Sequence, residues 1–102
     1  MLNIKTEIKD KVAEVVLDGR MDGAEAPKVD EAFNTLPETV EMVILDLEDL
    51  IYVSSAGLRV FLAAQKKMNA RSGRMKFMNV GENVMEIFET TGFDRIFDIS
   101  DN

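Results

Sequence analysis

The chain has 102 residues, enough for one domain, and its 46% hydrophobic and 30% charged residues are typical of a folded soluble protein. The net charge of −7 argues against nucleic acid as a partner, because phosphate neutralisation requires a basic surface. The absence of cysteine and histidine excludes disulfides, thiolate chemistry, the commonest general base and the commonest metal ligand.

The first half of the chain predicts two strands, a helix and a third strand. Residues 4–9 alternate loosely between apolar and polar side chains and residues 12–18 are rich in valine, so we expect a hairpin. Apolar residues at spacings of three or four predict a helix within 24–36, with Pro27 in its first turn. The apolar run within 40–47 is typical of a buried strand.

The second half predicts a helix, a strand and a second helix. We interpret residues 48–53 as a loop that leads into a helix, with an apolar stripe, over 54–73. Residues 74–80 alternate as a strand, and a short helix is expected from Asn83 as N-cap to Gly92. Three apolar residues after this helix are expected to pack back onto the core: Ile96, Phe97 and Ile99.

The order β-β-α-β-α-β-α predicts a single α/β domain over residues 1–102. Its sheet is expected to be largely parallel, with an antiparallel edge formed by the first two strands. The first ten residues contain no apolar run of a signal peptide, and no stretch approaches the about 18 apolar residues of a membrane span. We therefore expect a cytoplasmic protein that is not inserted in a membrane.

Two serines, Ser54 and Ser55, stand where the central helix begins. Serine is a favoured N-cap, so capping explains a serine here without any function. A phosphoryl group on either serine would also be stabilised, because a helix N-terminus offers unpaired N–H groups and partial positive charge. The small residues that follow, Ala56 and Gly57, permit close packing of the helix start.

Catalysis is not expected from these residues. Lys66 and Lys67 are the bases on the same helix, and they lie about three turns from the serines. Four acidic residues lie near predicted turns: Asp18, Asp22, Asp46 and Asp49. They would hold a metal only if the fold brought them together, and scattered acidic side chains are usually solvated. No phosphate-binding glycine loop is present, so a nucleotide-handling enzyme is disfavoured.

Charge is distributed unevenly along the chain. Residues 1–50 carry 13 acidic and 5 basic side chains, whereas residues 51–102 carry 6 and 7. No acidic residue occurs from 50 to 81, although six basic residues do. Arg59 lies one turn from Ser55. Three interpretations are open: Arg59 belongs to a solvated face, it contacts an acidic partner, or it lies near a phosphoserine.

The run ILDLEDLIYVSSAGLRVFL over residues 44–62 resembles the signature of STAS domains, the family of anti-sigma factor antagonists and of domains appended to sulfate transporters. The resemblance extends to the Gly-Arg-Met-Asp run over 19–22 and to the Thr-Gly-Phe run over 91–93. It implies a four- to five-stranded mixed sheet with helices packed mainly on one face. It covers nearly the whole chain.

The resemblance also implies a partner-switching function without catalysis. The unphosphorylated domain would bind an anti-sigma factor serine/threonine kinase and release a sigma factor, phosphorylation of Ser55 would inactivate it, and a serine phosphatase would restore it. Ser54 is the second choice for the modified residue. The partner-binding residues implied are Asp22, Ser54, Ser55, Ala56, Gly57, Leu58 and Arg59.

The sequence departs from well-known family members at Ser54, where many have aspartate before the phosphoserine. This departure leaves the choice of kinase open. No cofactor is expected, although some members bind nucleotide weakly near the position of Asp22. The alternative function is a STAS scaffold or interaction subunit of a transport or stress-signalling complex, without a phosphorylation switch.

Overall fold

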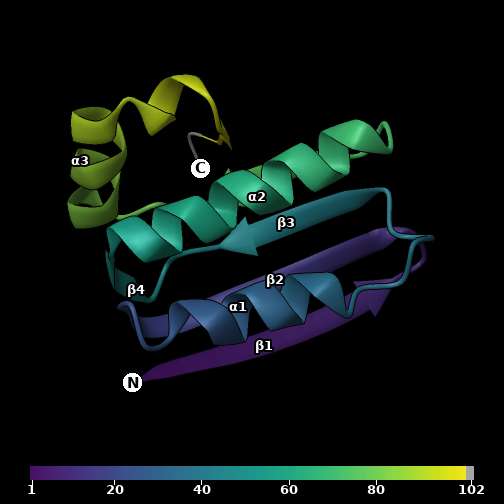
Figure 1. The fold of residues 1–102 in the computed structure, drawn as a ribbon, viewed down its shortest axis with the longest axis horizontal. Coiled ribbons are helices and arrows are strands. Elements are labelled where there is room, and N and C mark those ends of the chain that lie inside the picture. The colour runs from purple at the N-terminus through teal and green to yellow at the C-terminus, as the bar shows by residue number, and fades with distance from the viewer. Residues whose placement is uncertain (101–102) are drawn as a thin grey trace.

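The computed structural model describes residues 1–100, which form a six-stranded mixed sheet and three α-helices (Figure 1). Strands β1 (Leu2–Lys9) and β2 (Val12–Met21) pair antiparallel along their length, which confirms the expected hairpin. Asp10 makes the turn in the left-handed region, at φ 57°, where a short polar side chain is tolerated. β2 runs three residues further than predicted.

The remaining long elements alternate as expected. Helix α1 (Ala26–Asn34) carries Pro27 in its first turn, and strand β3 (Met42–Asp46) returns parallel to β2. Helix α2 (Ser55–Ala70) then leads to strand β5 (Arg74–Met78), which pairs parallel with β3. The main path of the sheet is therefore β1-β2-β3-β5, extended by β6.

Two short strands raise the total to six, against the four or five expected. β4 (Leu50–Val53) lies in the segment interpreted as a loop, and it pairs parallel with the last residues of β2. β6 (Asp98–Ile99) pairs parallel with β5. Strands of four and two residues are too short for alternation to reveal, and the acidic pair at 48–49 makes the first of them look like a loop.

Helix α3 (Glu82–Thr91) begins earlier than predicted. Its N-cap is Gly81, in an extended conformation, rather than Asn83, which lies inside the first turn. The N–H of Met85 donates to the Gly81 carbonyl at 2.9 Å, so the helical bonds already start there. The helix ends as expected at Gly92, which has a φ of 83°, and a 3₁₀ turn over Phe93–Arg95 follows.

Helices α1 and α2 lie side by side across one face of the sheet (Figure 1). In β3, in β5 and over residues 12–18 of β2, every second residue is buried, whereas the intervening residues are partly or fully exposed. An aromatic cluster joins α2, β5, α3 and the C-terminal segment, with ring centroids 4.5 to 6.5 Å apart: Phe61, Phe77, Phe88 and Phe97. These buried residues belong to one core.

No helix among residues 1–100 is long and apolar enough to cross a membrane. The domain predicted over 1–102 includes residues 101 and 102, which lie outside the described residues.

Candidate functional site

The ends of β2 and β4 bring two predicted site residues together. The two strands are parallel, and their last residues, Met21 and Val53, are partners in the register. Asp22 and Ser54 follow directly, so both leave the same edge of the sheet. The N–H of Ser54 donates to the Met21 carbonyl at 2.9 Å, which ties the start of α2 to the end of β2.

Gly19 lies where β2 closely approaches the start of β1 and begins to pair with β4. Its φ of 120° is one that residues with a side chain rarely adopt, and a Cβ there would lie 2.3 Å from the Met1 carbonyl oxygen. The register with β4 shifts between Gly19 and Arg20, as at a β-bulge. β2 thus pairs with β3 over residues 12–16 and with β4 from Gly19 onward.

The two serines have different environments. Ser54 is half-buried and is the N-cap of α2, and its Oγ accepts from the N–H of Gly57 at 3.2 Å. Ser55 is exposed as the first residue of the helix, and none of the described residues hydrogen bonds to its hydroxyl. The capping explanation thus applies to Ser54 and leaves the Ser55 hydroxyl accessible.

The next two motif residues belong to the core. Gly57 is buried, and a Cβ added there would lie 2.7 Å from Val53 Cγ2 and 3.2 Å from the Met21 side chain. Leu58 is 5% exposed. Of the partner-binding set, these two residues hold the helix start against the sheet, while Asp22, Ser54 and Ala56 are half-buried and Ser55 is exposed.

Arg59 is exposed one turn after Ser55. Its side chain lines a shallow groove of about 330 Å³ between α1 and α2, together with small side chains and one carboxylate: Gly23, Ala26, Pro27, Asp30, Ala56, Val60 and Ala63. No ion-pair partner of Arg59 occurs within residues 1–100. The guanidinium is therefore available to a group placed near the helix start.

The acidic residues make turns rather than a metal site. Asp22 Oδ1 accepts from the N–H groups of Ala24 and Glu25, both at 3.1 Å, and so shapes the turn before α1. Asp46 Oδ1 accepts from Asn79 Nδ2 at 3.2 Å and from the Glu48 N–H at 3.0 Å. Across the described part of the chain, no three acidic side chains gather where they could hold a metal ion.

The sequence matches the family model of the STAS domain over residues 3–102. The chain belongs to the STAS-domain family. A curated relative, the anti-sigma-B factor antagonist of Listeria monocytogenes, is 30% identical over 102 residues, which is 96% of this chain and 90% of the relative. The family, and the mixed α/β fold expected from it, are thereby confirmed.

Solved STAS structures share the whole fold. An anti-sigma factor antagonist from Mycobacterium paratuberculosis superposes with a TM-score of 0.87 at 21% identity, covering 100% of this chain and 87% of that one. The Bacillus cell fate determinant SpoIIAA in its phosphorylated form superposes with a TM-score of 0.76 at 18% identity, covering 96% and 91%. At these identities the likeness concerns the fold.

One contact and one exposed side chain beside the motif of this STAS domain were not predicted from the sequence. The guanidinium of Arg20 lies 4.6 Å from the centroid of the Tyr52 ring, a cation–π contact between β2 and β4. Next to it, Ile51 is 55% exposed. The signal was present as an apolar and aromatic run over 50–53, but it was assigned to a loop.

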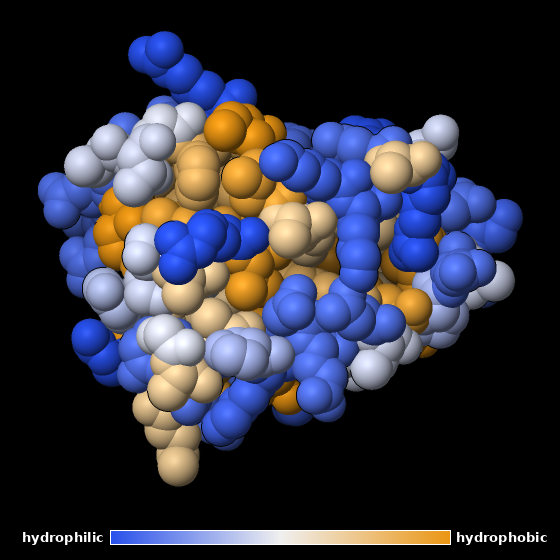
Figure 2. Space-filling view, viewed as in Figure 1, coloured by the Kyte–Doolittle hydropathy of each residue, from blue (hydrophilic) through white to orange (hydrophobic). Residues whose placement is uncertain are grey.

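On the face drawn in Figure 2, apolar surface lies mostly toward the end of the domain that holds the start of α2. Figure 2 shows orange surface mostly in the left half of this face, over α3 and the N-terminal half of α2, whereas the right half is mainly hydrophilic. Exposed apolar surface next to polar groups is a common property of protein docking sites. The Ser54–Arg59 segment lies at this end of the domain.

Proposed function

We propose that this STAS domain is an anti-sigma factor antagonist that acts by partner switching in the cytoplasm. Its docking surface is centred on the start of α2 and comprises Asp22, Ser54, Ser55, Ala56 and Arg59. Gly57 and Leu58 belong to the same segment and hold the start of the helix against the sheet. In the unphosphorylated state this surface binds an anti-sigma factor serine/threonine kinase, and a sigma factor is released.

The exposed hydroxyl of Ser55 is the observation that carries the proposal. A kinase must place the hydroxyl oxygen in line with a γ-phosphoryl group, which requires an accessible serine. Ser54 Oγ is held by the Gly57 N–H, whereas Ser55 Oγ has no partner within residues 1–100. The relative SpoIIAA has been solved in a phosphorylated form, which agrees with a phosphorylated residue on this fold.

Phosphorylation would change the docking surface without refolding the domain. A phosphoserine adds a charge of about −1.5 to −2 at neutral pH. On Ser55 this group would stand at the N-terminus of α2 and one turn from Arg59, so both the helix dipole and the guanidinium would stabilise it. The same charge would be desolvated in the complex, and Arg59 would no longer be free to pair with the kinase.

The proposed role requires no catalytic residue and no cofactor. The domain is a substrate and a ligand of the kinase, and a serine phosphatase returns it to the binding state. Asp22, the candidate for weak nucleotide contact, has Oδ1 engaged in the turn before α1.

The site assignment is tested by incubation with a candidate anti-sigma factor kinase and ATP. Trypsin releases both serines in one peptide, residues 29–59, so fragmentation of that peptide is needed to locate the phosphate. We expect a single phosphate on Ser55 and none on the Ser55→Ala variant. The Ser54→Ala variant is the matched control and should still be phosphorylated. A phosphate that persists on Ser55→Ala would refute the assignment.

The charge switch is tested with Ser55→Asp, which places a permanent negative charge at the helix start. Isothermal titration with the kinase should show an affinity at least about tenfold lower than for the wild type, which corresponds to about 1.4 kcal/mol. Ser72→Asp makes the same change at an exposed serine beyond the other end of α2, and it should bind like the wild type. Equal binding by Ser55→Asp and the wild type would instead support the scaffold alternative.

A further inference from the structure

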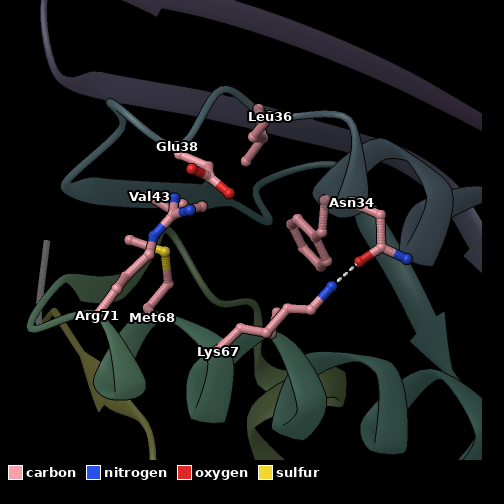
Figure 3. A pocket seen from close by; sticks show the side chains of 9 residues that line it. Asn34, Leu36, Glu38, Val43, Lys67, Met68 and Arg71 are labelled. Carbon is pink, nitrogen blue, oxygen red and sulfur yellow. Dashed lines mark hydrogen bonds between the residues drawn. The ribbon is translucent and has the colours of Figure 1, made fainter.

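A cavity of about 240 Å³ lies between the C-terminal halves of α1 and α2, away from the docking surface (Figure 3). The segment that enters β3, and β3 itself, form the side of the cavity that faces the sheet. The residues that line it come from these four parts of the chain and from the C-cap of α2: Phe33, Asn34, Leu36, Glu38, Val43, Ala64, Lys67, Met68 and Arg71.

The floor of this cavity is apolar. Phe33, Val43 and Met68 are all less than 9% exposed, and Leu36 and Ala64 add further aliphatic surface. Figure 2 shows a small apolar area between hydrophilic side chains in the right half of the same face. Such a floor favours a hydrocarbon group over water, because it offers no polar partner.

Two cations stand over this floor. Lys67 lies in the last turn of α2 and Arg71 is the C-cap of that helix, and both line the cavity. Figure 3 shows Lys67 reaching from α2 toward α1, where its Nζ hydrogen bonds to Asn34 Oδ1. Arg71 Nη2 donates to the Val40 carbonyl at 2.9 Å, which fixes the guanidinium at the edge of the cavity.

The rim has an excess of positive charge. Glu38 is the one carboxylate among the lining residues, against two cations. Within residues 1–100, neither Lys67 nor Arg71 is in ion-pair contact with a carboxylate. An anionic group placed above the apolar floor would therefore find two charged donors that are already positioned.

We propose that this cavity binds a small amphipathic carboxylate, with the hydrocarbon chain on the floor and the carboxylate between Lys67 and Arg71. At about 30 Å³ for each water-sized group, the cavity holds about eight non-hydrogen atoms. Hexanoate has this size and this distribution of charge. The site lies on the helix that carries Ser55 at its other end, but its occupation does not depend on the proposed switching function.

The proposal is tested by titrating the unphosphorylated chain, labelled with ¹⁵N, with hexanoate and following the amide signals by NMR. We expect saturable shifts centred on Phe33, Ala64 and Lys67, with a dissociation constant in the millimolar range or tighter. Acetate, which lacks the hydrocarbon chain, and 1-hexanol, which lacks the charge, should each bind at least about tenfold more weakly.

Variants separate charge recognition from general attraction to a basic helix. Lys67→Ala should weaken hexanoate binding about tenfold, and Glu38→Gln should strengthen it, because the only opposing charge on the rim is removed. Lys66→Ala removes the neighbouring exposed lysine, which does not line the cavity, and should change nothing. Shifts outside the cavity, equal binding of acetate, or equal effects of the two lysine variants would overturn the proposal.

Discussion

Two adjacent serines contribute differently to this fold because one peptide bond moves the side chain from a cap to the surface. Ser54 precedes the helix in an extended conformation, which turns Oγ toward the Gly57 N–H. Ser55 already has helical geometry, and its side chain is exposed. The first serine stabilises the helix on which the second is presented.

Stability measurements should distinguish these contributions. Ser54→Ala removes a capping bond and is expected to lower the free energy of unfolding by about 1 kcal/mol. Ser55→Ala removes an exposed hydroxyl and should change it by less than about 0.5 kcal/mol. Urea denaturation followed by circular dichroism measures both values. A larger loss from Ser55→Ala than from Ser54→Ala would show that the cap is assigned to the wrong residue.

The start of α2 is held against the sheet by a close approach at Gly57. This position lies over Met21 and Val53, the last residues of the two parallel strands whose ends define the site. Val53 is branched at Cβ and has little freedom to move aside. The contact therefore fixes where the helix begins, and with it the position of Ser55.

Gly57→Ala should be destabilising although alanine is the better helix former. Overpacking of about 1–3 kcal/mol opposes a gain in helix propensity of about 1 kcal/mol, so we expect a net loss of about 1 kcal/mol. Gly23→Ala is the matched control, because no atom lies within 4 Å of a Cβ added there. The comparison is made by thermal denaturation. A stabilised Gly57→Ala would mean that the approach is looser than described.

Patterns in the sequence located the long elements and the motif but not the short strands. Residues 12–18 and 54–73 carried enough alternation or periodicity for their types to be predicted correctly. β4 has four residues and pairs with the last residues of β2 across a register shift after Gly19, an arrangement that no local pattern reveals. For the same reason the meeting of Asp22 with Ser54 could be seen only in the fold.

Capping preferences were a limited guide to helix starts. They pointed to the serine pair at the start of α2, of which Ser54 is the cap, but for α3 they favoured Asn83 over Gly81. Glycine has no side chain that could accept a capping hydrogen bond, so a glycine cap gives no such signal in the sequence. Glu82 is then the first helical residue, where its negative charge suits the positive end of the helix dipole.

Across the molecule, one aromatic cluster connects the motif helix to the C-terminal half of the chain. Phe61 of α2 is fully buried and lies within 6.5 Å, between ring centroids, of Phe77, Phe88 and Phe97. These rings come from β5, from α3 and from the segment that leads into β6. The position of α2 is therefore set at its start by Gly57 and along its length by Phe61.

Phe61→Ala should have a large effect. Removal of a buried phenylalanine typically costs about 3–5 kcal/mol, a large part of the about 5–15 kcal/mol that stabilises a domain. Phe93→Ala is a useful comparison, because Phe93 is half-buried and contacts the cluster through Phe97. We expect a clearly smaller loss there, measured by urea denaturation. Equal losses from the two variants would place the centre of the core elsewhere.

The contact between Arg20 and Tyr52 has a practical consequence. Tyr52 is the only tyrosine in a chain that has no tryptophan, so its ring is the sole source of tyrosine fluorescence. That ring lies in β4, two residues before Ser54 and against a guanidinium. The fluorescence of Tyr52 therefore reports on changes beside the motif, and no dye needs to be attached.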